Sequence, residues 1–213
     1  MMNRSIVVTV ALCLGQPASG GADGLRVKIS PTVETVEVIH QAKPVTIMRD
    51  QGVDNTVNPI YARTSRDCPP FCIQPSVLAP GVDTIGELEV LDYLRQIAAG
   101  DNSVVVIDSR TAGWVEKGTI PGSISIPWTT LSPGADPFEI AEILEHTFGA
   151  ISQEGLWNYA NAKTLVLFCN GMWCGQSPSN IKALLNFGYP AHKIKWYRGG
   201  MQAWEILGLT VVR

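Results

Sequence analysis

The feature that most constrains the fold of this 213-residue chain is a series of short apolar runs that alternate with helical patterns after residue 83. Runs at 103–108, 164–168 and 193–197 are rich in β-branched and other apolar residues, which indicates strands buried on both faces. Strands that alternate with helices are typical of a parallel sheet with helices packed on each side. The sequence therefore predicts an α/β fold over residues 84–213.

The helices are predicted from their capping residues and their periodicity. Thr84-Ile-Gly-Glu87 has the pattern of a capping box at a helix start, and Gly100 is a stop signal. Between them, Leu88, Leu91 and Leu94 are spaced for one buried helical face. Asp-Pro and Ser-Pro pairs open two of the three further helices, which are expected over 136–149, 177–187 and 202–207.

Residues 1–22 have the layout of a secretory signal. A short positive segment ends at Arg4, an apolar run covers 6–14, and small residues follow up to Ala22. The apolar run is shorter than the roughly 20 residues that a membrane-spanning helix needs. We therefore expect cleavage near Ala22, a periplasmic or secreted mature protein, and no membrane span.

Residues 23–83 are predicted to form a small β-containing extension rather than a full domain. The runs 33–39 and 44–49 read as two strands, and Gln41-Ala42-Lys43 between them is long enough for a hairpin loop. The stretch 52–81 is irregular and rich in Asn, Pro and Gly. This extension is a candidate contact surface for a protein partner.

Composition excludes several classes of function. Hydrophobic residues make up 46% of the chain and charged residues 16%, which gives enough apolar surface for a core and excludes global disorder. A net charge of −3 offers no basic excess for binding nucleic acid. No zinc spacing, phosphate loop or dinucleotide fingerprint occurs, and His40, His146 and His192 are scattered. Neither a metal nor a cofactor is expected.

The reactive chemistry is predicted in the loop after the run 164–168. Cys169 is the first residue past this strand, at the edge where α/β sheets bind ligands. Gly171 and Gly175 let the loop curl, and Ser177 can cap the helix that follows. Backbone N–H groups and the positive helix end would stabilise a thiolate or persulfide at Cys169. We expect a reactive sulfur open to a cleft; the alternative is a buried structural cysteine.

Four segments in this order resemble the rhodanese (sulfurtransferase) family, and the resemblance covers residues 84–213. They are Val106-Ile-Asp-Ser-Arg110, Gly118-Thr-Ile-Pro-Gly-Ser-Ile-Ser-Ile-Pro127, the loop from Cys169, and Tyr197-Arg-Gly-Gly-Met-Gln-Ala-Trp204. The resemblance implies a rhodanese-like parallel sheet flanked by helices. It also implies that Cys169 takes sulfane sulfur from a donor such as thiosulfate or a persulfide and passes it to a thiophilic acceptor.

The same resemblance implies a substrate-binding loop and a supporting pair, Asp108 and Arg110, which orients the chain after its strand. The loop is about two residues longer than the six that are common in the family, and it contains no Arg or Lys. Attraction of an anion therefore rests on backbone donors and the helix end, with Lys182 a turn further in. The loop residues are Asn170, Gly171, Met172, Trp173, Cys174, Gly175, Gln176 and Ser177.

Two alternatives to sulfur transfer remain open. Cys174 stands about where the family's loop often carries an Arg, and it could resolve an oxidised or persulfidated Cys169 as a disulfide. The segment Trp173 to Ser177 also resembles the Trp-Cys-Gly-x-Cys motif of thioredoxins, with Ser in place of the second cysteine. These patterns allow a thiol–disulfide or redox protein that uses Cys169 and Cys174. The second alternative is a non-catalytic binding module.

The other cysteine pair is Cys68-Pro-Pro-Phe-Cys72 in the extension. In an exported protein such a pair favours a local structural disulfide. A redox partner for Cys169 and a soft-metal site, for example for copper(I), are the other interpretations.

Overall fold

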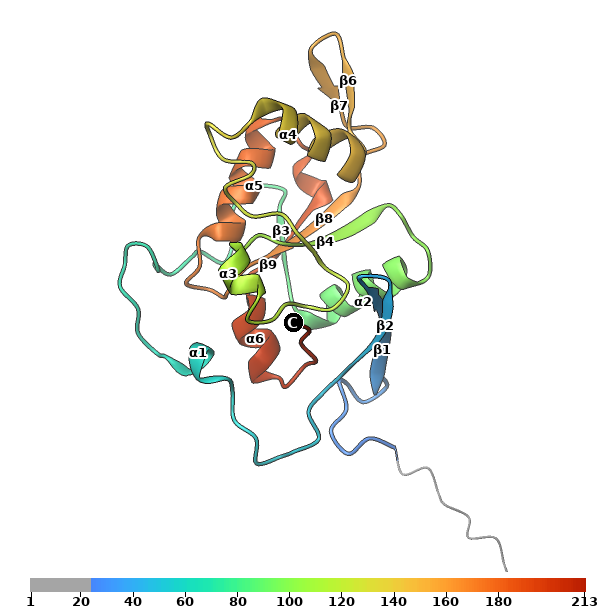
Figure 1. Ribbon diagram of the computed structural model, residues 1–213, viewed down its shortest axis with the longest axis vertical. Coiled ribbons are helices and arrows are strands. Elements are labelled where there is room, and N and C mark those ends of the chain that lie inside the picture. The colour runs from blue at the N-terminus through green and yellow to red at the C-terminus, as the bar shows by residue number, and fades with distance from the viewer. Residues whose placement is uncertain (1–23) are drawn as a thin grey trace, which may run out of the picture.

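The computed structural model describes residues 24–213, so the predicted signal segment 1–22 lies outside the described residues. Its centre is a five-stranded sheet in the order β3-β9-β8-β4-β5, in which every pairing is parallel (Figure 1). The prediction of an α/β fold with a parallel sheet is confirmed. The strands are β3 (Asp83–Ile85), β4 (Val104–Asp108), β5 (Ile124–Ser125), β8 (Thr164–Phe168) and β9 (Ile194–Tyr197).

The central strands are apolar throughout because both faces of the sheet are covered. Along β8, Val166 and Phe168 enter one hydrophobic cluster, and Leu165 and Leu167 enter the other. Successive side chains of a strand point to opposite faces, so an unbroken apolar run fits a strand between two helical layers.

The helices divide between the two faces of the sheet. Helices α2 and α6 contribute Leu91 and Trp204 to the first cluster, whereas η1 and α5 contribute Leu144 and Leu184 to the second. The predicted covering of both faces is confirmed. The helices are α1 (Pro59–Ala62), α2 (Glu87–Ala98), α3 (Ala112–Val115), α4 (Pro137–Glu142), the π-helix η1 (Ile143–Thr147), α5 (Gln176–Asn186), the 3-10 helix η2 (Ala191–Lys193) and α6 (Gly200–Ile206).

The start of α2 differs from the prediction. Thr84 pairs with Trp196 of β9 as part of β3, so the chain there is extended and the helix begins at Glu87. The cap is Gly86, whose N–H donates to the Glu89 carboxylate at 2.9 Å. The predicted apolar face is rotated as a result: Leu91 and Leu94 are buried with Val90, whereas Leu88 is 51% exposed.

The extension contains the predicted hairpin, formed by β1 (Thr35–His40) and β2 (Lys43–Met48) in antiparallel pairing. Its turn has two residues rather than three, because Lys43 pairs with His40; Gln41 and Ala42 have φ values of 49° and 62°. Positive φ at both turn residues matches the right-handed twist of the strands. The hairpin's buried side chains, Val36, Val38 and Ile47, join the same cluster as α2.

After the hairpin, the chain passes α1 and runs around the outside of the sheet until it enters β3 (Figure 1). Its start is tied to the C-terminal segment: the Asp50 N–H donates to Gly208 O at 2.7 Å, and the Thr210 N–H donates to Met48 O at 3.1 Å. The extension is thus packed and hydrogen-bonded against both ends of the 84–213 region.

A second hairpin, β6 (Ile151–Gln153) and β7 (Leu156–Asn158), was not anticipated from the sequence. It projects beyond α4, away from the sheet (Figure 1). Within residues 24–213, no helix is both long and apolar enough to cross a bilayer.

Candidate active site

The site lies where the central strands end side by side. Asp108, Phe168 and Tyr197 are the last residues of β4, β8 and β9, and they are in register across the sheet. Cys169 follows Phe168 directly, and the loop after it leads into α5. The carboxyl ends of parallel strands are the usual place for ligand binding in such a sheet.

The first turn of α6 is hydrogen-bonded to this loop. The N–H groups of Met201 and Gln202 donate to the carbonyl oxygens of Cys169 and Asn170, both at 2.9 Å. Gly200 has a φ of 54°, and a Cβ at this position would collide with the Cys169 carbonyl oxygen. The second glycine of the Gly199-Gly200 pair is therefore required for a close approach of two backbones.

Cys169 is 2% exposed, and in its thiol form the sulfur donates to the Cys174 carbonyl oxygen at 3.3 Å. The Ser177 hydroxyl donates to the Cys169 sulfur at 3.1 Å, and the Cys174 thiol and the backbone N–H groups of Gly171 and Ser177 donate to the thiolate as well. Burial by itself would raise the pKa of Cys169, but these hydrogen bonds outweigh it and lower the pKa to about 7. The thiolate is therefore accessible near neutral pH.

Cys174 has the opposite role. Its thiol donates to Cys169 and is buried, and both effects raise its pKa, so that it stays protonated beside the Cys169 thiolate. Its sulfur also lies 3.9 Å from the Asn170 side-chain nitrogen and 3.8 Å from the Gln176 side-chain oxygen. The pair therefore consists of one thiol with a lowered pKa and one with a raised pKa.

Ser177 is not the helix cap that the sequence suggested. The cap residue of α5 is Gly175, the helix begins at Gln176, and Ser177 is a fully buried residue of the first turn. Its hydroxyl accepts a hydrogen bond from the Trp196 indole N–H at 3.1 Å while it donates to Cys169. The Ser177 hydroxyl thus donates a hydrogen bond to the Cys169 sulfur and does not cap a backbone N–H of the helix.

Asp108 and Arg110 form a buried ion pair. Arg110 donates to Asp108 through Nε at 2.8 Å and through Nη2 at 2.6 Å, and both side chains are fully buried. The remaining Arg110 nitrogen, Nη1, donates to the Asn170 side-chain oxygen at 3.3 Å and to the Tyr61 hydroxyl at 3.2 Å. The pair is out of reach of a substrate and positions the first loop residue after Cys169.

The extension contributes residues that sequence reasoning missed. Arg66 stacks over the Trp173 ring at 3.8 Å, and Phe71 packs edge-on against the same ring, with centroids 5.5 Å apart. The Gln74 N–H donates to the Met172 carbonyl oxygen at 2.8 Å. These residues lie in the irregular stretch of the sequence, which carries no signal that would place them beside the loop.

A cleft of about 410 Å³ adjoins the loop. Cys174 is part of its wall, but Cys169 is not, so the expectation that the Cys169 sulfur itself opens to a cleft is wrong: Cys169 is buried, and only its neighbour Cys174 reaches the cleft. No charged side chain of the described residues lines it, in keeping with a loop that lacks Arg and Lys. Its wall includes Pro70, Phe71, Trp114, Trp128, Asn170 and Gln176.

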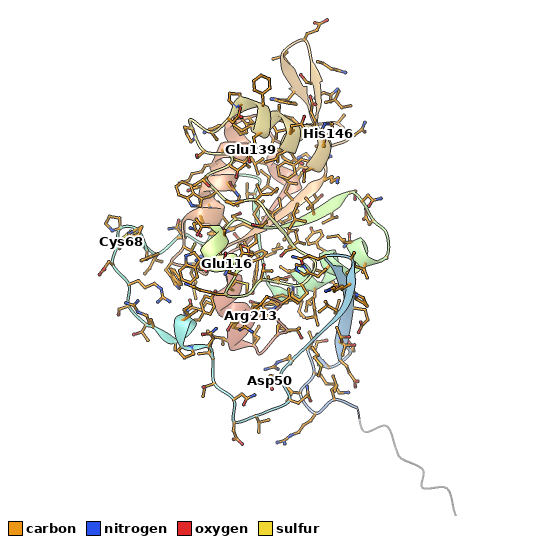
Figure 2. The ribbon with its side chains drawn as sticks, in the orientation of Figure 1. Asp50, Cys68, Glu116, Glu139, His146 and Arg213 are labelled. Carbon is orange, nitrogen blue, oxygen red and sulfur yellow. A yellow bond between two sulfur atoms is a disulfide. The ribbon has the colours of Figure 1, made fainter. Side chains whose placement is uncertain are left out.

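Cys68 and Cys72 are paired as a disulfide, with Cα atoms 4.6 Å apart. Cys68 lies on the outer side of the extension (Figure 2), while Pro70 and Phe71 between the two cysteines line the cleft. In residues 24–213, no three His, Cys, Asp or Glu side chains converge as a metal site would require. His40 accepts the Gly122 N–H at 3.1 Å.

The remaining loop residues differ in exposure. Met172 points outward and is 47% exposed, whereas Asn170 is buried beneath the loop. Trp173 is partly buried and donates its indole N–H to Gln202 at 2.7 Å. The structure thus brings Cys169, Cys174 and Ser177 together, and it uses Asn170 and Trp173 to fix the loop to its surroundings.

Comparison with protein families gives a match over residues 90–207, more than half of the chain, to the family described as the rhodanese-like domain. A search of curated proteins found no match. Similar solved structures include a protein from Lactobacillus plantarum (20% identity, 61% of this chain and 87% of that chain, TM-score 0.42). A thiosulfate sulfurtransferase from Pseudomonas aeruginosa has 21% identity over 62% of this chain and 20% of its own, with a TM-score of 0.41. The human single-domain sulfurtransferase has 21% identity over 58% of this chain and 95% of its own, with a TM-score of 0.37.

Proposed function

Because the chain belongs to the rhodanese-like domain family, we propose that it is a sulfurtransferase whose nucleophile is Cys169. The observation that carries the proposal is the position of Cys169 directly after β8, at the carboxyl end of the sheet, with the Ser177 hydroxyl donating to its sulfur at 3.1 Å. A thiolate is the nucleophilic form of cysteine, and donors around it also stabilise a persulfide anion.

The reaction has two balanced steps. In the first, the Cys169 thiolate attacks the sulfane sulfur of a donor; a bond forms between the two sulfurs, and the rest of the donor leaves with the electron pair of the broken bond. In the second, an acceptor thiolate attacks the outer sulfur of the Cys169 persulfide, and the Cys169 thiolate leaves. The Ser177 hydroxyl and the Cys174 thiol stabilise that leaving thiolate, because both donate hydrogen bonds to it.

In this scheme substrates approach the buried Cys169 sulfur at Cys174, because Cys174 contacts Cys169 and lines the cleft. Within residues 24–213 no charged side chain lines the cleft, and Arg66, a cation that stacks on the Trp173 ring of the loop, lies outside it. We therefore favour a persulfide donor over thiosulfate, which is a dianion.

A second candidate function is supported by the contact between the two cysteines, in which the Cys169 thiol donates to the Cys174 carbonyl oxygen at 3.3 Å. Cys174 can attack the inner sulfur of a Cys169 persulfide, which forms a Cys169–Cys174 disulfide and releases hydrogen sulfide. In that case the protein is a thiol–disulfide protein. Mass mapping in graded redox buffers tests this reaction: a reversible Cys169–Cys174 bridge supports it, and two free thiols under all conditions contradict it.

The exported location and the Cys68–Cys72 disulfide belong to the same proposal. A signal over residues 1–22 would deliver the chain to an oxidising compartment, where a disulfide between residues four apart persists. N-terminal sequencing of the protein from fractionated cells, combined with alkylation without reductant, tests both points. A mature chain beginning near residue 23, with only Cys169 and Cys174 alkylated, is expected.

The catalytic assignment is tested by sulfur transfer from a low-molecular-weight persulfide to cyanide, compared among wild type, Cys169→Ala and Cys174→Ser. Loss of transfer in Cys169→Ala together with a folded protein is expected. Retained transfer in that variant would refute the assignment. If Cys174→Ser keeps transfer to cyanide, Cys174 acts only as a hydrogen-bond donor and carries no sulfur. The same variant is the matched control for Cys169→Ala, because it also removes a cysteine from this loop.

A further inference from the structure

A second and larger cavity, of about 750 Å³, adjoins the cleft at Cys174. The two share Trp128 and Ser179 in their walls and are therefore neighbours; together they are called the groove below. The lining residues of the second cavity come largely from α5 and from the chain that precedes and begins α4, segments that lie side by side in Figure 1. Nothing in the sulfur-transfer scheme above uses this second cavity.

The second cavity is mostly apolar. Ser179, Lys182, Ala183, Asn186 and Phe187 line it from one face of α5, at the spacing of a single helical stripe. The opposite wall and the floor are supplied mainly by apolar side chains, among them Leu131, Pro137, Ile140 and Trp157. A concave site of this size and lining is typical of a small-molecule site.

Two polar features interrupt the apolar wall. Lys182 is the one charged residue among the described residues that line either cavity. At 1.5 Å per residue it lies about 9 Å along the axis of α5 from Gln176, which borders the cleft at Cys174. In addition, the Trp128 indole N–H is buried without a partner in the described part of the chain, although its ring borders both cavities. Buried donors without partners are rare, and this one lies where the two cavities meet.

We propose that the groove binds the sulfur acceptor, and that the acceptor is an elongated, largely apolar thiol with an anionic end. The thiol lies at Cys174, the apolar chain lies along α5, and the anion meets Lys182. This inference rests on the proposed function, because it assigns the acceptor for the Cys169 persulfide. Chain length and end charge, rather than a cation at the loop, then select the acceptor.

The test uses wild-type protein carrying a Cys169 persulfide and measures persulfide loss in single-turnover experiments. The acceptors are the ω-thiol acids mercaptopropanoate, mercaptohexanoate and mercaptooctanoate, and the ω-thiol alcohols of the same lengths. Each methylene that enters the groove should raise kcat/KM by about two- to fourfold. The acids should exceed the alcohols by about two- to fivefold at the longer lengths, as for one exposed ion pair.

The role of the Lys182 charge in binding the anionic end is tested with Lys182→Gln. The matched control is Lys43→Gln, because Lys43 is an exposed lysine on β2 that does not line the groove. Lys182→Gln should abolish the preference for acids over alcohols, and Lys43→Gln should keep it. Equal rates at all chain lengths, or an unchanged acid preference in Lys182→Gln, would overturn the proposal.

Binding of octanoate, which has no sulfur, separates this inference from the proposed function. Calorimetry should show octanoate binding to wild type and Lys43→Gln, weakened about two- to fivefold in Lys182→Gln. If octanoate binds in this way but no persulfide forms on Cys169, the groove is a binding site for elongated apolar anions and the sulfur-transfer proposal fails. If persulfide transfer to mercaptopropanoate proceeds but octanoate does not bind, the groove assignment fails alone.

Discussion

Replacing Ser177 with alanine tests how the Cys169 thiolate is stabilised. The substitution removes the O–H that donates to the sulfur at 3.1 Å and leaves the remaining donors in place. A hydrogen bond to a charged group contributes about 1.5–3 kcal/mol, and one pKa unit corresponds to about 1.4 kcal/mol. The pKa of Cys169 should therefore rise from about 7 to about 8–9.

The rate at a single pH would understate this change. At pH 7 the thiolate fraction falls about five- to fiftyfold, but a thiolate of higher pKa is intrinsically more nucleophilic. With a Brønsted coefficient of about 0.4–0.5, alkylation at pH 7 slows only about two- to eightfold. The assay is therefore a full pH profile of iodoacetamide labelling, with Cys169 followed by peptide mapping, and the midpoint is the readout.

The matched control is Ser123→Ala, which removes a buried hydroxyl that donates to Ile120 O at 2.7 Å and does not contact Cys169. Its labelling midpoint should equal that of wild type. Loss of Ser177 Oγ also leaves the Trp196 N–H without its acceptor, so Ser177→Ala should lower the free energy of unfolding by about 1–3 kcal/mol. A midpoint that stays near pH 7 in folded Ser177→Ala would refute the role of the hydroxyl.

Three further predictions follow from the same contacts. The pKa of Cys169 is lowered from 9.0 to about 7 on folding, so its stabilising contribution is full above pH 9 and is lost as the pH falls through 7. The difference in unfolding free energy between wild type and Cys169→Ser should thus grow by about 2 kcal/mol from pH 7 to pH 9 in urea titrations; a flat difference contradicts the lowered pKa. Asp108→Asn leaves the buried Arg110 charge without its partner and should destabilise the fold by about 3–5 kcal/mol in the same assay, whereas a loss under 1 kcal/mol would mean that the pair is not buried as described. Replacing both Cys68 and Cys72 with serine opens a five-residue loop and should cost about 2 kcal/mol of stability without moving the Cys169 labelling midpoint; a shifted midpoint would show that the disulfide acts on the site.

The strands β4 and β8 were predictable from the sequence because burial on both faces of the sheet gives each of them a short, nearly unbroken apolar run. Such a run is typical of a buried parallel strand. Strand β3 was missed because it is a three-residue edge strand with two exposed positions, and its residues read equally well as a helix start. The hairpin β6–β7 was missed because its strands are three residues long and largely exposed.

At the site, the position of Cys169 follows from its place directly after a buried strand, and local sequence is enough to find it. The partners of its loop come from distant segments. Trp196 reaches Ser177 from the neighbouring strand, and Tyr61 reaches Arg110 and Asn170 from the extension. A single sequence shows which residues follow a strand, but it does not show which remote side chains the sheet and the extension bring against them.

Peptide-resolved mass spectrometry after treatment with a low-molecular-weight persulfide tests the central claim most directly. One added sulfur atom on the peptide that contains Cys169, absent from Cys169→Ala and present in Cys174→Ser, is the expected result. A sulfur atom carried by Cys174 instead, or no added sulfur on a folded and reduced protein, would contradict Cys169 as the sulfur-carrying residue.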